Sequence, residues 1–105
     1  MAIATSSVTS GNTYTAIYDT GIVINPYLHS IAEGTGTTAS GYGSHAEGVT
    51  TYASATGAHA EGATTTASAV YSHAEGYYTT ANASYGHAEG WYTTASGIAS
   101  HAEGI

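Results

Sequence analysis

The stretch from residue 73 to residue 104 reads HAEGYYTTANASYGHAEGWYTTASGIASHAEG and contains the tetrapeptide His-Ala-Glu-Gly three times. The tetrapeptide recurs at a constant spacing of 14 residues, and the spacing extends back through most of the chain. Its glutamates are Glu33, Glu47, Glu61, Glu75, Glu89 and Glu103. Five of the six blocks begin with His, and the first has Ile31 in that place. A fixed period of this kind is the signature of a repeat architecture.

A second, weaker motif lies midway between these blocks. It reads TTASG from Thr37, TYASA from Thr51, TTASA from Thr65, TTANA from Thr79 and TTASG from Thr93. Because its alanines fall halfway between those of the blocks, Ala recurs every seven residues from Ala32 to Ala102. Each 14-residue unit therefore consists of two half-units.

The residue types in this period favour strands over helices. A coiled coil would need an apolar seam of Leu or Ile, whereas every block carries Gly and four of the five copies of the second motif begin with a Thr-Thr pair. In a short strand, side chains alternate between faces, so Ser44, Ala46 and Gly48 would face inward, with His45 and Glu47 outward. We therefore expect an all-β fold, a parallel β-solenoid (β-roll) with 14 residues, two short strands and two turns per coil.

The composition predicts a thin core for this repeat domain, residues 30–105. The chain has 105 residues and contains no Phe. Leu, Ile and Val are sparse, and much of the apolar fraction is Ala and Tyr. An interior of Ala, Gly, Ser and Thr requires two sheets closer than the usual spacing of about 10 Å, and it buries little apolar surface. We therefore expect copies of the chain to assemble side by side or end to end.

Residues 1–29 depart from the repeat and form the second predicted unit. Alternation at Tyr14, Ala16 and Tyr18 and the run from Ile22 to Ile24 predict two short strands, and residues 6–12 are expected to be flexible. Such a terminal segment is typical of a cap that shields the first coil, or of an attachment module.

The charge balance excludes several classes of partner. Seven Asp and Glu stand against no Lys or Arg, so nothing would neutralise the phosphates of nucleic acid or of anionic lipid. Without Cys there is no disulfide framework and no thiolate metal site. The opening MAIATSSVTS has neither a basic segment nor a long apolar run, so we expect no export signal and no membrane insertion.

The pattern S-x-A-x-G-x-x-T-x-A-x-G-x-x in residues 30–105 resembles the head repeats of YadA-like trimeric autotransporter adhesins. Its His-Ala-Glu-Gly form resembles the repeats of phage tail fibres and related appendage proteins. The resemblance implies a β-roll and a homotrimer. In the adhesin heads, outward Val or Ile residues form the trimer contact, whereas this chain has His and Glu at those positions.

Stacked coils would align the His and Glu side chains into columns. Carboxylates about 4.8 Å apart repel by roughly 0.9 kcal/mol per pair at the dielectric constant of water, and His is the only nearby donor or cation. This face has three interpretations: a solvated polar surface, an interface where three chains meet on a threefold axis, or a site for a metal held by three imidazoles. The metal site is the least favoured, because no HxH or HExxH spacing occurs. The candidate residues are His45, Glu47, His59, Glu61, His73, Glu75, His87, Glu89, His101 and Glu103.

The other strand of each coil and the two turns complete the expected surface. Thr and Ser alternate outward on the second strand, which is typical of a soluble strand face and also resembles in pattern the threonine faces of ice-binding β-solenoids. One turn is expected to hold residues 35, 49, 63, 77, 91 and 105 beside residues 36, 50, 64, 78 and 92. The aromatic residues of this turn and of the opposite turn have two interpretations. They pack against one another and against neighbouring subunits, or they form a recognition surface for a receptor or glycan. These residues are Tyr42, Tyr71, Tyr77, Tyr78, Tyr85, Trp91 and Tyr92.

The repeat argues against enzymatic activity, because six equivalent glutamates on a flat face do not form a cleft with distinct acid and base groups. We expect a non-enzymatic structural fibre or adhesin module of a phage tail fibre or similar appendage, with no cofactor or metal. Its partners would be further copies of itself and a cell-surface receptor or glycan, and its location a virion or extracellular appendage. The alternatives are a self-polymerising extracellular filament subunit and an ice-binding β-solenoid.

Overall fold

The computed structural model describes residues 2–5, 15–18 and 21–105, with side chains from residue 21 onward. The segment predicted to be flexible, residues 6–12, lies outside the described residues. The described residues form strands and turns and contain no helix.

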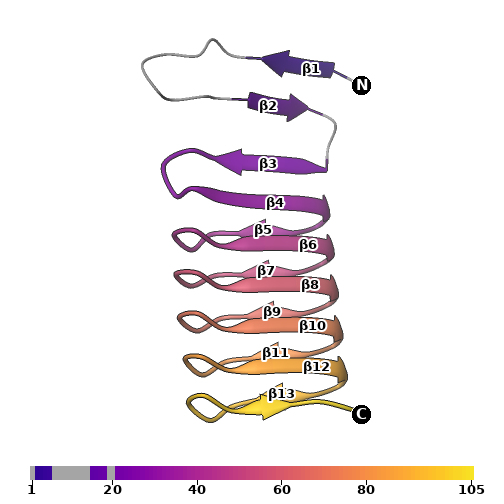
Figure 1. Ribbon diagram of the computed structural model, residues 1–105. Helices are drawn as coiled ribbons and strands as arrows, with labels where there is room; N and C mark the ends of the chain where they lie inside the picture. Colours follow the sequence, from indigo (N-terminus) through magenta and orange to yellow (C-terminus); the bar gives the residue numbers. More distant parts are fainter. Residues whose placement is uncertain (1, 6–14, 19–20) are drawn as a thin grey trace.

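Residues 30–105 wind into a flattened solenoid of two parallel sheets (Figure 1). The long strands form one sheet: β4 (Ser30–Thr35), β6 (His45–Val49), β8 (His59–Ala63), β10 (His73–Tyr77), β12 (His87–Trp91) and β14 (His101–Ala102). The second sheet consists of β5 (Thr38–Ala39), β7 (Tyr52–Ala53), β9 (Thr66–Ala67), β11 (Thr80–Ala81) and β13 (Thr94–Ala95). Each residue pairs with the residue 14 positions on, as His73 does with His87, so the predicted parallel β-solenoid with 14 residues per coil is confirmed.

The N-terminal strands run differently from the coils. Strand β1 (Ala2–Thr5) pairs antiparallel with β2 (Thr15–Tyr18), and β3 (Ile22–Asn25) pairs antiparallel with β4. The Asn25 side chain accepts hydrogen bonds from the backbone N–H groups of Tyr27 and Leu28, which closes the turn between β3 and β4. Strand β3 thus lies along the outer edge of the first coil, where a cap would lie.

The interior between the two sheets contains small side chains only, as the composition predicts. The largest fully buried side chains are Thr51, Thr65 and Thr79, followed by Ser30 and Ser72. The apolar core is a double column of alanines: Ala46, Ala53, Ala58, Ala60, Ala67, Ala74, Ala81, Ala88 and Ala95. The Cα trace measures 45 × 27 × 12 Å, so the molecule is a thin slab.

The prediction that the glycine of each block faces the interior is wrong. Gly62 and Gly76 are exposed, and their φ angles of 106° and 111° interrupt the alternation of the strand. A Cβ on Gly62 would collide with the backbone carbonyl of Gly76 in the next coil. Glycine is therefore required here because the backbones of successive coils approach each other, and the glycines that do line the interior are Gly41 and Gly86.

Each coil contains two turns, each with one left-handed residue. The first turn, from the long strand to the short strand, places Thr50, Thr64, Tyr78 and Tyr92 at φ between 54° and 57°. The second turn, from the short strand to the next long strand, does the same at Tyr71, Tyr85 and Ala99, at φ between 56° and 63°. Backbone hydrogen bonds such as Tyr78 N–H to Ala63 O, 3.0 Å, link each first turn to the last residue of the long strand one coil earlier.

One turn prediction needs correction. Residues Thr35, Val49, Ala63, Tyr77 and Trp91 were expected in the turn, but they are the last residues of the long strands. Hydrogen bonds along the parallel sheet, such as Trp91 N–H to Gly104 O at 2.8 Å, extend past the block glycine and include them. The turn itself is therefore shorter than the motif spacing indicates.

Candidate functional site

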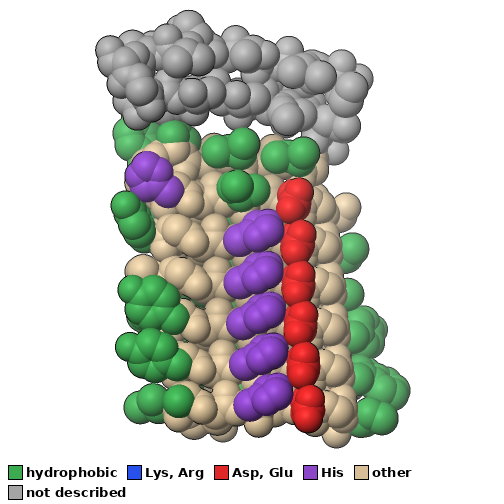
Figure 2. Space-filling model, viewed as in Figure 1, with side chains coloured by type: hydrophobic (Ala, Val, Ile, Leu, Met, Phe, Trp, Pro, Cys, Tyr) green, Lys and Arg blue, Asp and Glu red, His purple; other side chains and the backbone are tan. Residues whose placement is uncertain are grey.

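The His and Glu side chains form two adjacent columns on the outer face of the long-strand sheet (Figure 2). The five imidazole rings from His45 to His101 are stacked with centroids 4.6 to 4.8 Å apart and planes within 7° of parallel. Identical register from coil to coil places each ring over the next, because the strands pair without any offset. We call these five histidines with the six block glutamates the His/Glu ladder.

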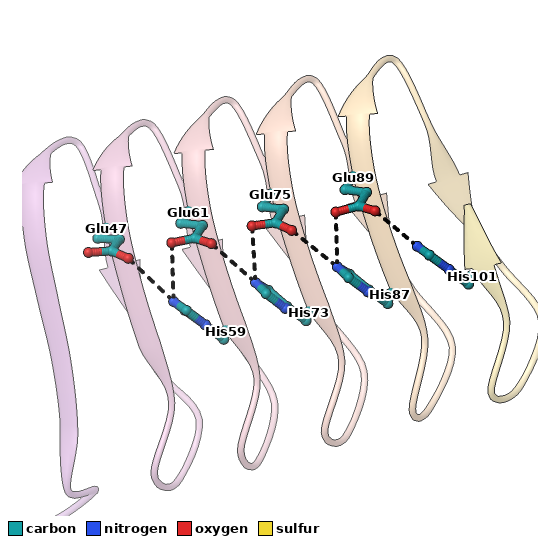
Figure 3. A network of polar contacts seen from close by, with 8 residues as sticks. All are labelled: Glu47, His59, Glu61, His73, Glu75, His87, Glu89 and His101. Atoms are coloured by element: carbon teal, nitrogen blue, oxygen red, sulfur yellow. Dashed lines mark hydrogen bonds and ion pairs between the residues drawn. The ribbon is translucent and has the colours of Figure 1, made fainter. Parts of the chain in front are cut away.

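Each imidazole of the ladder lies closer to the glutamate of the preceding coil than to the glutamate of its own strand (Figure 3). The Nε2 atom of His73 is 3.4 Å from Oε1 of Glu61 and 3.9 Å from Oε2 of Glu75. His87 repeats the arrangement with 3.3 Å to Glu75 and 3.8 Å to Glu89. The contacts therefore run between coils and link the ladder along the solenoid axis.

The first and last histidines show what the sequence analysis missed. His45 contacts Glu33 at 3.1 Å, a residue outside the predicted ladder because its own block begins with Ile31. The only signal for Glu33 was its place in the 14-residue series. His101 pairs with Glu89 at 3.2 Å.

Hydrogen bonding along the ladder is uneven. His45, His87 and His101 lie within hydrogen-bond distance and geometry of a glutamate. The Nε2 atoms of His59 and His73 are shielded from solvent and have no hydrogen-bond partner. These two nitrogens have only the longer carboxylate contacts of 3.4 to 3.5 Å, compared with 3.1 Å for His45 and 3.2 Å for His101.

The carboxyl groups of the ladder influence one another's protonation. Hydrogen bonds with Glu75 and Glu47, then burial and the charges of both neighbours, raise the pKa of Glu61 to about 7. Hydrogen bonds with Glu61 and Glu89 lower the pKa of Glu75 to about 2, and a hydrogen bond with Glu61 also lowers the pKa of Glu47. A carboxyl that keeps its proton and donates it to neighbouring carboxylates has a raised pKa, and the carboxylates that accept this hydrogen bond have lowered pKa values.

The position of His73 within the histidine column makes its imidazole harder to protonate. Burial, followed by repulsion from His59, lowers the pKa of His73 below 6.5. Its imidazole is therefore neutral at physiological pH, and the Nε2 atom is available either as a donor or as a lone pair.

An open groove of about 700 Å³ runs beside the glutamate column. It is lined by four glutamates of the ladder and by the glycine that follows each of them: Glu33, Gly34, Glu47, Gly48, Glu61, Gly62, Glu75 and Gly76. The groove exists because the glycine column has no side chains. It repeats with the coil period, so its carboxylates occupy equivalent positions in successive coils.

The second sheet presents hydroxyl groups outward, as predicted. Its outward residues are exposed or half-buried: Thr38, Ser40, Tyr52, Ser54, Thr66, Ser68, Thr80, Asn82, Thr94 and Ser96. Tyr52 interrupts the otherwise short side chains, and it is exposed.

The aromatic residues lie on two opposite edges of the slab, which correspond to the two turns of each coil. The first-turn edge carries Tyr77, Tyr78, Trp91 and Tyr92, with the rings of Tyr78 and Tyr92 stacked at 4.8 Å. The second-turn edge carries Tyr42, Val70, Tyr71, Tyr85 and Ile98, with Tyr71 and Tyr85 at 5.9 Å. Apolar side chains are visible along both edges in Figure 2.

The fold and the ladder define a repeat protein of the parallel β-solenoid class. Comparisons with protein-family models, with curated proteins and with solved structures found no match to this chain. Within residues 2–5, 15–18 and 21–105, the structure contains no helix that is long and apolar enough to span a membrane.

Proposed function

We propose that this chain is a non-enzymatic structural module of a fibre or adhesin, assembled as a homotrimer in a phage tail fibre or a similar appendage of a virion or cell surface. The resemblance of its repeats to YadA-like heads and tail-fibre repeats supports the class of protein. The proposal rests on the architecture of one coil and on where the large apolar side chains lie.

The distribution of side-chain size carries the proposal. Nothing larger than Thr is fully buried, whereas Trp91 is 48% exposed and Tyr85 is 60% exposed. All the tyrosines and valines from residue 21 onward are exposed as well. Rows of exposed aromatic side chains mark surfaces that contact other proteins, and burying them against another chain would be favourable.

The arrangement of the two edges favours a closed ring of chains. The first-turn edge and the second-turn edge lie on opposite sides of the slab and carry different residues. When unlike surfaces of identical chains meet head to tail, a ring forms if the rotation closes. We propose that the first-turn edge of each chain packs on the second-turn edge of the next. The His/Glu ladder needs no partner chain, because each imidazole already contacts carboxylates of its own chain.

The ladder also supports a structural role over catalysis. Among the described residues, the groove beside the ladder repeats the same carboxylate and the same glycine in successive coils. Glycoside hydrolysis, for example, requires two carboxyl groups with different roles at a defined separation. Aromatic side chains that remain outside the trimer contact would be available to a receptor or glycan.

Variants of the two edges test the proposed ring. We expect the wild type to be a trimer by light scattering, and both Trp91→Ser/Tyr92→Ser and Tyr71→Ser/Tyr85→Ser to be monomers. An equimolar mixture of the two variants should contain dimers, because one intact edge of each kind remains. Tyr52→Ser, on the face of the second sheet, is the matched control and should stay trimeric. A monomeric wild type, or a trimer that survives loss of either edge, contradicts the ring.

The hydroxyl face supports a second candidate, an ice-binding solenoid. Thr66, Thr80 and Thr94 occupy in-register positions of adjacent strands and are exposed or half-buried. Thermal hysteresis that disappears in Thr66→Leu/Thr80→Leu would establish this candidate. Fibres far longer than one chain in electron micrographs would instead indicate a self-polymerising filament subunit.

A further inference from the structure

We propose that the His/Glu ladder binds divalent transition-metal ions such as zinc, each held by one imidazole and by the two carboxylates that flank it along the solenoid axis. This site lies within one chain and does not require the trimer. It differs from the symmetric arrangement of three imidazoles considered from the sequence, because its ligands come from successive coils.

The spacing of the donor atoms fits a zinc ion. In a tetrahedral site with bonds of about 2.0–2.1 Å, neighbouring ligand atoms lie about 3.3–3.4 Å apart. The Nε2 atom of His73 lies 3.4 Å from Glu61 Oε1 and 3.9 Å from Glu75 Oε2, so only the second carboxylate has to move by a few tenths of an ångström. His59 has the corresponding contacts, 3.5 Å to Glu47 and 3.9 Å to Glu61.

The direction of the imidazoles supports the same site. In Figure 3 the Nε2 atom of each labelled His faces the gap between two successive carboxylates, where contacts to both are drawn for His59, His73 and His87. A metal ion in this gap would accept the nitrogen lone pair in the plane of the ring. The Glu carboxylates would then bridge successive gaps.

The unpartnered nitrogens in the middle of the ladder provide an independent observation. The Nε2 atoms of His59 and His73 are shielded from water and make no hydrogen bond. Such desolvated nitrogens would gain a ligand when an ion occupies the gap. Neutral imidazole is also the form that binds zinc.

The charge of the chain favours cations at this face. No Lys or Arg is present to neutralise the glutamates, and successive carboxylates repel each other. A nitrogen ligand among carboxylates suits zinc and its neighbours in the transition series, whereas magnesium and calcium prefer sites made of oxygen alone.

The geometry limits how many ions one chain can hold. His59, His73 and His87 are the histidines with contacts to two carboxylates. Neighbouring gaps share a carboxylate, and ions in them would lie about as far apart as the ring centroids, 4.6 to 4.7 Å. Repulsion between divalent ions at that distance favours filling alternate gaps. We expect two ions per chain, at His59 and His87.

Zinc binding is tested on the full chain after removal of metals with EDTA and transfer to a non-chelating buffer at pH 7.5. Calorimetric titration with zinc chloride and metal analysis after gel filtration should give two bound zinc ions per chain. The triple variant His59→Gln/His73→Gln/His87→Gln should bind zinc at least tenfold more weakly, and magnesium should bind the wild type at least tenfold more weakly than zinc.

Two controls separate the ladder from non-specific binding. His29→Gln changes an exposed histidine outside the ladder, and Thr66→Gln/Thr80→Gln/Thr94→Gln places the same side chain on the opposite sheet; both should bind zinc like the wild type. Nitrogen-15 NMR of the wild type should show zinc-dependent shifts of ladder Nε2 resonances and none at His29, which keeps the test valid if the triple variant does not fold. Unchanged ladder resonances at saturating zinc, or full zinc binding by a folded triple variant, would overturn the proposal.

Discussion

The Nε2 atom of His73 lies 3.4 Å from a carboxylate oxygen of Glu61, twelve residues earlier in the chain and one coil away. The contact to Glu75, two residues later in the same strand, is longer at 3.9 Å. The ladder therefore links each coil to its neighbour through side chains as well as through the backbone.

Neutralising Glu61 should stabilise the protein at alkaline pH. The pKa of Glu61 is raised to about 7 from its ordinary 4.5, so the folded state favours the protonated carboxyl. This contribution is present below pH 4.5 and is lost as the pH rises through 7. Because Glu61→Gln stays uncharged, we expect it to unfold about 4–8 °C above the wild type at pH 8, which corresponds to about 1 kcal/mol after allowance for solvent screening.

Thermal unfolding at pH 8 and at pH 4 measures this effect. The two proteins should converge at pH 4, where the wild-type carboxyl is protonated in both states. Glu103→Gln, an exposed residue at the end of the column, is the matched control and should unfold like the wild type at both pH values. Equal melting temperatures of Glu61→Gln and wild type at pH 8 would show that the glutamates do not share a proton.

The block glycines should not tolerate alanine where another coil follows. A Cβ on Gly62 would meet the carbonyl of Gly76, whereas Gly104 has the same φ of about 105° and nothing within 4 Å of its added Cβ. We expect Gly62→Ala to lose more than about 3 kcal/mol of stability, since neither backbone can move without breaking the sheet. Gly104→Ala should lose only about 1–2 kcal/mol, from its backbone conformation.

Chemical denaturation of the two alanine variants separates backbone strain from the collision between coils. Equal losses for Gly62→Ala and Gly104→Ala would mean that the coils do not approach as closely as the structure shows.

The left-handed threonine of the first turn should be improved by glycine. Thr64 has a φ of 54°, where a β-branched side chain is strained, and glycine is not. We expect Thr64→Gly to raise the free energy of unfolding by about 1 kcal/mol. The same change at Thr66, within strand β9, should lower it by about 1 kcal/mol, because there glycine only adds flexibility to the unfolded chain and removes a strand-favouring side chain. A loss of stability in Thr64→Gly would contradict the turn geometry.

The hydroxyl face should not bind ice if the structural role is correct. Tyr52 stands among the threonines of the second sheet, and its exposed ring prevents a flat array of hydroxyl and methyl groups. We expect no thermal hysteresis from the wild type at millimolar concentration. Hysteresis that increases in Tyr52→Thr would instead favour the ice-binding candidate.

The periodic features of the fold could be predicted from the sequence, because a strict repeat constrains every coil at once. The 14-residue spacing of Glu61 and Glu75 led directly to parallel, in-register strands, and the small residues at Ala60 and Thr65 led to the thin core. The exposed face of Thr66 and Ser68 followed from alternation alone.

Features that depend on backbone conformation could not be predicted in this way. Simple alternation placed Gly62 inside, because a sequence does not show the positive φ that turns the strand outward there. The same limitation hid the groove along the glutamates and the extension of the long strand to Tyr77. The closer contact of His73 with Glu61 than with Glu75 depends on the conformations of these side chains, which the motif spacing does not determine.

The ladder, the thin core and the proposed assembly all depend on the coil geometry. The distance between residues 38 and 94 tests this geometry most directly. Thr38 and Thr94 are separated by four steps of in-register pairing through Tyr52, Thr66 and Thr80. Electron–electron resonance between spin labels in Thr38→Cys/Thr94→Cys, diluted with unlabelled chain, should give a narrow distribution near about 19 Å, four times the strand spacing of about 4.8 Å. A broad distribution, or a mean beyond about 40 Å, would contradict the stacked coils, since an extended or helical path over these residues is far longer.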